Sequence, residues 1–328
     1  MTKVHEKENE KLKILVFGAG VLGSLYAARL QEAGHNVTVV ARGQRYQDIK
    51  AHGIVLEYFD SGEQTTTAVN LLDGMPPEKH YDLCLVPVQK IQLESVLEAL
   101  SVNSKIPAFL FMVNNAEGPQ VLIDALGRER VLLGFANAGG ERDGHIVRLM
   151  IAKGKGVVMG ELDGTKSERL QRFAAAFQEA GIKVDFSSKM DAWLRYHVAL
   201  VGPLANALYM AGSCNYKLAR NPEIIRKGLR GIREAINVVR ANGFPIEPPA
   251  LKVMLAIPDF ILVLLAKRFI GTPLLDIGGA RHARSAREEM TRLNEELFAL
   301  ARNAGMETPA MKELHRYADP SVPPVVDC

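Results

Sequence analysis

The sequence predicts an α/β protein of two domains, in which a parallel β-sheet covered by helices precedes an all-helical region. In the first half of the chain, short apolar runs rich in β-branched residues alternate with helical patterns. This alternation is typical of a parallel sheet with helices on both faces. After about residue 187, long helical patterns separated by Gly/Pro breaks dominate. The 328 residues also exceed what one hydrophobic core usually supports.

The first βαβ unit is the clearest part of the pattern. The run KILVF (13–17) is followed by GAGVLGS, by a helical pattern at 25–33 and by the β-branched run NVTVVAR (36–42). Further strands are predicted at 82–88, 108–113 and 131–136, and helices at 93–100, 191–210, 222–242, 251–268 and 286–304. We therefore assign residues 1–12 to a disordered tail, 13–187 to the sheet domain and 188–328 to the helical domain.

Composition excludes several classes of protein. A net charge of +3, from 40 basic and 37 acidic residues, is too balanced for a nucleic-acid-binding protein. The cysteines, Cys84, Cys214 and Cys328, have no metal-ligand spacing, so we expect no metal and a reducing compartment, the cytoplasm. The most apolar run, FILVLLA (260–266), is too short to span a membrane. It fits a buried helix or a subunit contact.

The glycine turn after the first strand predicts a dinucleotide site. Gly18 permits a tight turn, Gly20 leaves room for a pyrophosphate, and Gly23 lets the helix and the strand pack closely. The backbone of Ala19, Val21 and Leu22 lies at the helix N-terminus, whose free N–H groups favour phosphate. A turn that merely needs small residues is the alternative. The strand–turn–helix context favours a Rossmann-type domain.

The end of the second strand indicates which dinucleotide is bound. NAD sites usually place an Asp or Glu there for the ribose hydroxyls, but this chain has Arg42. With Arg45 close by, Arg42 can bind a 2′-phosphate through two hydrogen bonds. The sequence therefore favours NADP over NAD, with a solvated surface arginine as the alternative interpretation of Arg42.

Four segments in order resemble the ketopantoate reductases (2-dehydropantoate 2-reductases). They are KILVFGAGVLGSLYAARLQEAGHNVTVVARG at the start, NNAEG (114–118), GGERDG (139–144) and REEMTRLNEELFALARNAGMETP (287–309). The resemblance implies an N-terminal Rossmann domain, a C-terminal helical domain, and reduction of the ketone of ketopantoate by hydride transfer from NADPH, in pantothenate biosynthesis.

The resemblance also implies roles for single residues. Glu289 matches the family's late catalytic and substrate-binding glutamate, and Asn115 matches the asparagine of its Q-N-G turn, although Ala116 replaces the glycine. Gly140 falls where the backbone runs along the cofactor. Thr272 corresponds to a substrate-binding serine if a short insertion precedes Glu289.

The substrate half departs from the family pattern, which is W-x-K with asparagines four and eight residues beyond the lysine. Anchored on Trp193, this chain has Arg195, Ala199 and Pro203, and Gln89, beside Lys90, replaces a further lysine. An arginine can polarise a carbonyl or grip a carboxylate, but it is a poor proton donor.

Two interpretations of this helix remain open. Arg195 shares a helical face with Ala199, Gly202 and Asn206, so it can act as a catalytic electrophile with Asn206 as a substitute amide. Alternatively it forms an interdomain ion pair. His197 lies on another face with Trp193 and is either a packed histidine or an acid.

Three functions compete. The first is an NADPH-dependent 2-keto acid reductase, with ketopantoate as the default substrate. The second is a related NADP dehydrogenase acting on another keto acid or an opine-like substrate, and the third is a catalytically degraded NADPH sensor. Arg281, Arg284 and Arg287, three residues apart, are a solvated face or a site for an anionic substrate. Glu289 favours an enzyme, because a sensor has no need for that carboxylate. We also expect a homodimer through the helical domain.

Overall fold

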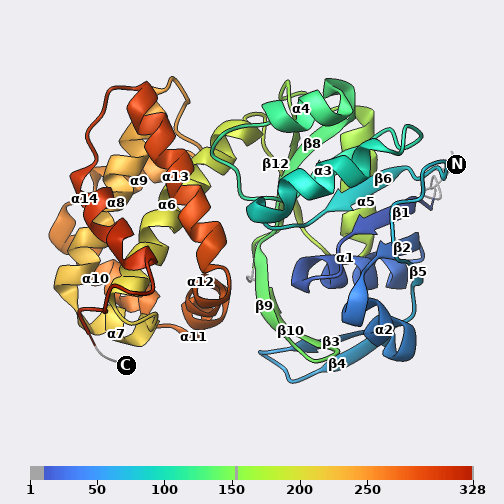
Figure 1. The fold of residues 1–328 in the computed structure, drawn as a ribbon, viewed down its shortest axis with the longest axis horizontal. Coiled ribbons are helices and arrows are strands. Elements are labelled where there is room, and N and C mark those ends of the chain that lie inside the picture. The colour runs from blue at the N-terminus through green and yellow to red at the C-terminus, as the bar shows by residue number, and fades with distance from the viewer. Residues whose placement is uncertain (1–10, 152–153, 327–328) are drawn as a thin grey trace, which may run out of the picture.

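The computed structural model describes residues 11–151 and 154–326 (Figure 1). Residues 1–10 of the predicted tail and Cys328 lie outside this part of the chain. The tail prediction is wrong for residues 11 and 12. Leu12 is 1% exposed and its backbone N–H donates to His35 Nδ1 at 3.2 Å. Lys11 pairs with Glu179 at 3.0 Å, so both residues belong to the folded domain.

Within the described residues, an eight-stranded sheet forms the first half in the spatial order β12-β11-β8-β7-β6-β1-β2-β5. Its strands are β1 Lys13–Phe17, β2 Asn36–Val40, β5 Asn70–Leu72, β6 Leu83–Val86, β7 Phe109–Phe111, β8 Val131–Phe135, β11 Val157–Glu161 and β12 Val184–Phe186. Each neighbouring pair is parallel except β8 and β11, which are antiparallel. The predicted fold class, a parallel-rich sheet domain followed by a helical region, is confirmed.

Helices cover both faces of this sheet, so its central strands are largely apolar. In β1, Ile14 and Val16 belong to the core that contains α1 (Val21–Glu32) and α5 (Glu168–Glu179). Leu15 and Phe17 belong to the core that contains α3 (Leu93–Ser101) and α4 (Gln120–Leu126). Successive side chains of a strand point to opposite faces, which explains this division. Helix α2 (Gly43–His52) lies beside β5 (Figure 1).

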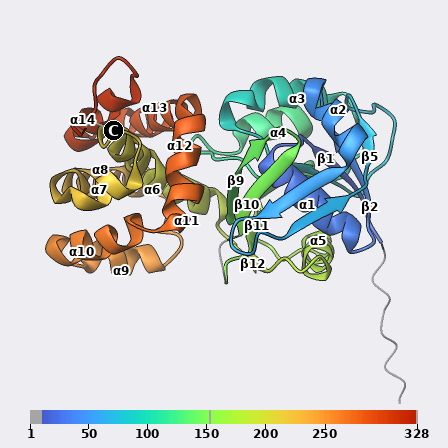
Figure 2. The same ribbon diagram turned by 90° about the horizontal axis from the view of Figure 1, so that it is seen from below.

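A second sheet, which the sequence pattern did not predict, packs over α1. Its order is β4-β3-β10-β9, with β3 Ile54–Tyr58, β4 Gln64–Thr67, β9 Ala138–Asp143 and β10 Ile146–Ile151. The sequence QTTT has β-branched threonines but no apolar residue, and AGGERD has no β-branched residue, so neither shows the apolar alternation of a strand. Figure 2 shows β9 on the side of the sheet domain that faces the helices, where it contacts α12.

The second half of the described chain is helical. Its α-helices are α6 Met190–Met210, α7 Asn215–Arg220, α8 Pro222–Ala241, α9 Ala250–Ala256, α10 Asp259–Ile270, α11 Pro273–Leu275, α12 His282–Ser285, α13 Arg287–Asn303 and α14 Pro309–His315, with a π-helical segment at Asp276–Arg281. The prediction of one helix over 251–268 is wrong, because Pro258 separates α9 from α10. The predicted domain division at 187/188 falls between β12 and α6 and stays a prediction.

In this domain α6 and α8 pack against each other in the core, with α13 and α14 alongside (Figure 1). None of the helices in the described part of the chain combines the length and the apolar character needed to cross a bilayer.

Candidate functional site

A cavity of about 920 Å³ lies between the sheet domain and the helical domain. Residues that follow β1, β2, β6, β7 and β8 line one side of it, at the carboxyl ends of these strands. The opposite side is formed by α6, the π-helical segment, α12 and the start of α13. Ligands of open α/β sheets bind beyond the carboxyl ends of the strands, so this is the expected position for a cofactor and its substrate.

The glycine loop forms one end of the cavity. Gly18, Ala19, Gly20, Val21 and Leu22 line it, and Gly20 is the N-cap of α1 without a side-chain cap. A Cβ atom built on Gly23 would lie 1.9 Å from the carbonyl oxygen of Gly18, so only glycine permits this packing of helix on strand. The uncapped N–H groups at the start of α1 therefore lie beside the cavity, where a pyrophosphate fits.

Gly140 lies on β9 and also lines the cavity. It pairs with Leu149 of β10, and a Cβ atom at this position would lie 2.1 Å from the carbonyl oxygen of Arg148. The sheet therefore needs glycine here. Its backbone is in the place that the resemblance indicated, although its contact with a cofactor stays a prediction.

The arginines beside the glycine loop have different roles. Arg42 is exposed, lines the cavity, and its side chain forms no hydrogen bond or ion pair with other described residues. Arg45 departs from expectation, because it is 6% exposed and its guanidinium donates to Ala19 O, His145 O and Ser24 Oγ at 2.9–3.0 Å. Arg45 therefore holds the loop in place and has no free fork for a phosphate. Burial lowers its pKa, to which the charge of Arg142 on β9 contributes.

Glu289, near the start of α13, lines the cavity and is 2% exposed. Its Oε1 accepts a hydrogen bond from the backbone N–H of Lys90 at 3.0 Å, which joins the two domains. Its Oε2 is buried without a hydrogen bond, and His282 Nε2 lies 3.7 Å away. The carboxylate is thus fixed on one side and has an unsatisfied oxygen on the other.

Asn115 is brought close to Glu289 but does not line the cavity. Its side chain holds the turn, since Nδ2 donates to Gly118 O at 2.7 Å and Oδ1 accepts from Gly118 N at 3.1 Å and from Lys90 Nζ at 3.0 Å. The neighbouring Asn114 lines the cavity instead, and its Oδ1 is buried without a partner.

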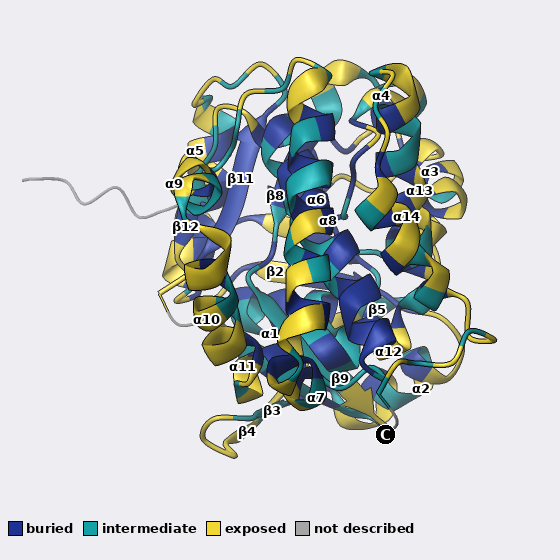
Figure 3. Cartoon of the chain, turned by 90° about the vertical axis from the view of Figure 1, so that its left-hand side faces the viewer, coloured by how far each residue is buried: buried dark blue, intermediate teal, exposed yellow. Residues whose placement is uncertain are grey.

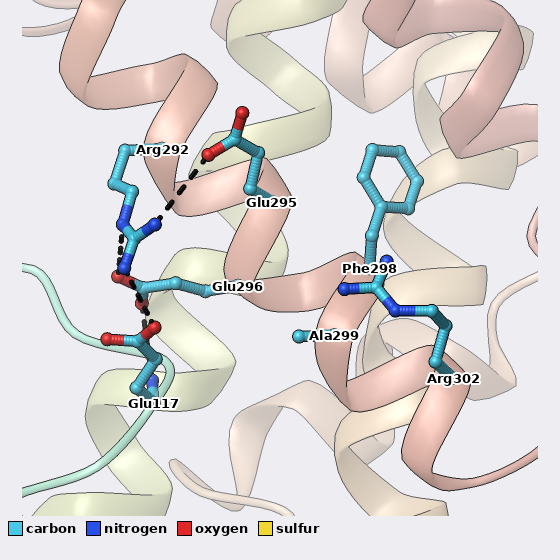
Figure 4. Close-up of a pocket in the computed structure, with 7 residues that line it drawn as sticks. All are labelled: Glu117, Arg292, Glu295, Glu296, Phe298, Ala299 and Arg302. Atoms are coloured by element: carbon cyan, nitrogen blue, oxygen red, sulfur yellow. Dashed lines mark hydrogen bonds and ion pairs between the residues drawn. The ribbon is translucent and has the colours of Figure 1, made fainter.

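Lys90 is the centre of a buried ion cluster between the domains. Its side chain is 5% exposed, and its Nζ lies 3.0 Å from Glu117 Oε2 and 3.0 Å from Glu296 Oε1. The other oxygen of Glu296 accepts from the backbone N–H groups of Ala116 and Glu117 at 2.8 and 3.2 Å. Arg292 lies beside two members of this cluster, Glu117 and Glu296 (Figure 4), and its guanidinium is 3.0 Å from Glu117. Burial raises the pKa of Glu296, and the Lys90 ammonium opposes this effect.

Arg195 does not face the cavity, contrary to expectation. It is 5% exposed, its Nε donates to Asp191 at 3.0 Å, and its terminal nitrogens donate to the carbonyl oxygens of Ala116 and Glu117. Its guanidinium also lies 4.0 Å from the centre of the Phe244 ring. The alternative interpretation, an interdomain ion pair, does not describe this geometry either, because the ion pair with Asp191 lies within α6 and the contacts across the domains are hydrogen bonds to backbone oxygens. A catalytic role for Arg195 stays a prediction.

The cavity-facing side of α6 is formed by His197, Val201, Leu204, Ala205 and Leu208. The face that was expected to border the cavity therefore lies elsewhere, and Asn206 is fully buried with neither side-chain atom hydrogen bonded. His197 packs against the rings of Trp193 at 5.4 Å and Phe135 at 4.1 Å. Burial lowers its pKa to about 4, so the imidazole is neutral at neutral pH.

The remaining predicted residues are not gathered at the cavity. Thr272 caps α11 and its hydroxyl donates to Phe269 O at 2.7 Å, away from the cavity lining. Arg281 lines the cavity and is paired with Glu141 at 2.7 Å and Asp276 at 3.1 Å. Arg284 binds Ser213 O, and Arg287 lies over Tyr209, so the three arginines do not form one substrate-facing stripe.

Sequence reasoning missed Arg142, Asn114 and His282, which all line the cavity. Arg142 lies on β9, a strand that the sequence pattern did not predict. His282 lies on the short helix α12, which was not predicted either. Within the described residues, no group of three or more His, Cys, Asp or Glu side chains is placed to hold a metal ion.

Comparison with known proteins agrees with this geometry. Residues 14–164 match the family model of the ketopantoate reductase PanE/ApbA. The 2-dehydropantoate 2-reductase of Aquifex aeolicus (strain VF5) is 27% identical over 239 residues, which cover 71% of this chain and 74% of that protein.

Solved structures share the fold. A PanE/ApbA family ketopantoate reductase from Ralstonia eutropha JMP134 superposes with a TM-score of 0.74 at 23% identity, covering 93% of this chain and 97% of the other. D-mandelate dehydrogenase, in a ternary structure with NADH and anilino(oxo)acetate, has a TM-score of 0.76 at 16% identity and covers 93% and 96% of the two chains. Residues 14–164 are therefore similar to the ketopantoate reductase PanE/ApbA family, and the relatives support an oxidoreductase of that type.

Proposed function

We propose that this protein is an NADPH-dependent reductase of the ketone group of a small 2-keto acid. One observation carries the proposal. A single cavity connects the uncapped N-terminus of α1, which suits a pyrophosphate, with the buried carboxylate of Glu289. A cofactor sensor does not require that carboxylate, whereas a reductase needs a polar group beside the reacting carbonyl.

The residues beside the cavity fit NADPH. The backbone of Gly18–Leu22 would hold the pyrophosphate, Gly140 would lie along the cofactor, and Arg42 with Arg142 would bind the 2′-phosphate. When bound, NADPH supplies the hydride that reduces the ketone. Arg42 and Arg142 support the choice of NADPH because neither side chain has an ion-pair or hydrogen-bond partner among the described residues, which leaves both available for an anion.

Ketopantoate is the default substrate, and the lining of α6 supports a second candidate. Val201, Leu204, Ala205 and Leu208 are apolar and suit a keto acid with a bulky apolar side chain. D-mandelate dehydrogenase, a fold neighbour, is named for an aryl 2-hydroxy acid. For either substrate, Arg281 provides positive charge for the carboxylate.

A panel of 2-keto acids, followed by the loss of NADPH absorbance, tests the function. We expect turnover of ketopantoate or of a keto acid with an apolar side chain, and little turnover of aldehydes without a carboxylate. Binding of NADPH with no turnover of any panel member would support the sensor instead. Turnover of amino acid conjugates alone would support the opine-type dehydrogenase.

NADPH should bind at least about ten-fold more tightly than NADH, because a charge-assisted contact with the 2′-phosphate is worth about 1.4 kcal/mol or more. Arg42→Ala should remove most of this preference by weakening NADPH alone. Fluorescence titration measures both affinities, and Arg29→Ala, on the far part of α1, is the matched control. Equal affinities of the parent for both nucleotides would contradict the assignment of Arg42.

We further propose a homodimer through the helical domain, in a reducing compartment such as the cytoplasm. Phe260, Leu264, Leu265 and Phe269 on α10 are 50–76% exposed and recur at helical spacing, so they form one apolar face. Figure 3 shows that much of α10 is exposed. Monomers rarely expose such a patch. Light scattering should give a dimer for the parent and a monomer for Leu264→Glu, and a monomeric parent would refute the proposal.

The proposal of a reducing compartment is supported by the thiols of Cys84 and Cys214, which form no disulfide.

A further inference from the structure

We infer that His282, oriented by Glu289, is the proton donor to the substrate oxygen. This inference rests on the proposed function and names the residue that supplies the proton of that reaction. An acid is needed because hydride transfer to a ketone leaves an alkoxide, and the cavity contains no lysine among its described lining residues. Arginine is a poor donor, and Arg195 is directed to backbone carbonyls outside the cavity.

The geometry of the pair supports this role. His282 and Glu289 both line the cavity, and Nε2 of the imidazole lies 3.7 Å from Oε2 of the carboxylate. That oxygen is buried and has no hydrogen bond, while the other oxygen is held by the Lys90 N–H. A fixed carboxylate beside an imidazole can orient the ring. This leaves Nδ1 as the nitrogen that can reach a substrate.

The backbone around His282 is also unusual. The residue directly follows the π-helical segment Asp276–Arg281, and Gly278 and Gly279 of that segment line the cavity as well. Short π-helical segments occur frequently at functional sites. The His282 side chain is 41% exposed, so water can return a proton to it after each reaction.

Other groups around His282 do not take its place. His197, on α6, also lines the cavity, but burial and the nearby charge of His282 lower its pKa to about 4. A neutral His197 donates no proton to an alkoxide at neutral pH, and it permits a positive charge on His282. Two further charged residues lie on β9. Glu141 is already paired with Arg281, and Arg142 keeps its proton, so neither donates a proton to the substrate.

The step balances as follows. Bound NADPH would supply a hydride, with its electron pair, to the ketone carbon, so that the π electrons of the C=O bond would move to the oxygen. The N–H bond at Nδ1 of the His282 imidazolium breaks, and its proton forms the O–H bond of the 2-hydroxy acid. The imidazole becomes neutral and regains a proton from water, while Glu289 keeps its charge throughout.

The test compares His282→Gln and Glu289→Gln with the parent and with His80→Gln, which changes an exposed histidine far from the cavity lining. We expect His282→Gln to lower kcat by about 10² to 10⁴, the usual contribution of a general acid. NADPH affinity, measured by fluorescence, should remain within two-fold. The decline of kcat at alkaline pH should disappear in this variant, because its donor no longer titrates.

A binding measurement separates catalysis from structure. Calorimetric titration of the NADPH-loaded enzyme with oxamate, an unreactive 2-keto acid analogue, should show affinity that falls as the pH rises. His282→Gln should abolish this pH dependence, and Glu289→Gln, which keeps the shape of the side chain, should weaken it. If His282→Gln fails to fold, His282→Asn and Glu289→Gln give the same comparison.

The two proposals fail in different ways. If no 2-keto acid is reduced by the parent, the proposed function is overturned. If a keto acid is reduced and His282→Gln matches the parent in kcat and in its pH profile, the role of His282 is overturned and the function stands.

Discussion

Lys90→Met should destabilise the folded protein by about 3 kcal/mol or more, the range seen when one partner of a buried ion pair is removed. The variant leaves the carboxylate of Glu296, which is fully buried, without its ammonium partner at 3.0 Å. The remaining contacts of Glu296, two backbone N–H groups and Arg292 at 3.9 Å, compensate only in part. Urea unfolding at pH 7.5 measures the loss.

A double variant separates the cost of the unpaired charge from other effects. Lys90→Met with Glu296→Gln removes both charges and should recover most of the stability, because a buried pair adds little over neutral groups. Lys105→Met is the matched control, since the Lys105 side chain is 54% exposed and lies 3.9 Å from Glu78. It should stay within about 0.5 kcal/mol of the parent. A Lys90→Met variant as stable as this control would show that the cluster does not hold the domains together.

The sheet domain could be predicted because its determinants are local. The strand β1, the glycine loop and α1 are consecutive in sequence, and each carries its own periodic pattern. The second sheet could not be predicted, since β3 and β10 pair across some ninety residues and β9 has an AGGERD sequence without strand character. A strand of that composition is stabilised by its partner and by α1, which are tertiary effects.

The residues of the candidate site also fall into those that local motifs predict and those that only tertiary contacts place. The glycine loop, Arg42 and Glu289 could be singled out because each belongs to a contiguous motif; all of them line the cavity, and their roles stay predictions. The face of α6 was misjudged, because Arg195 looks chemically suited to catalysis but is drawn to the carbonyl oxygens of Ala116 and Glu117 on another element. His282 could not be selected, since it lies on the short helix α12, and the non-helical backbone of Ala286 interrupts the helical pattern between α12 and its partner Glu289 on α13.

His197 should make the protein sensitive to acid. Its pKa in the folded state is lowered from 6.5 to about 4 by burial and by the charge of His282, whereas in the unfolded chain it returns to its usual value. Between these two values the unfolded state binds more protons, so folding stability is complete above pH 6.5 and is lost as the pH falls toward 4. A change of this size corresponds to about 3 kcal/mol.

His197→Phe tests this directly, because phenylalanine keeps the ring packing with Trp193 and Phe135 but cannot take up a proton. Urea unfolding of parent and variant from pH 7.5 to 4.5 should show a difference that grows by about 2 to 3 kcal/mol in favour of the variant as the pH falls. His80→Phe, at an exposed position, should leave the pH dependence unchanged. Parallel stability curves for the parent and His197→Phe would show that His197 takes up its proton as readily in the folded state as in the unfolded chain.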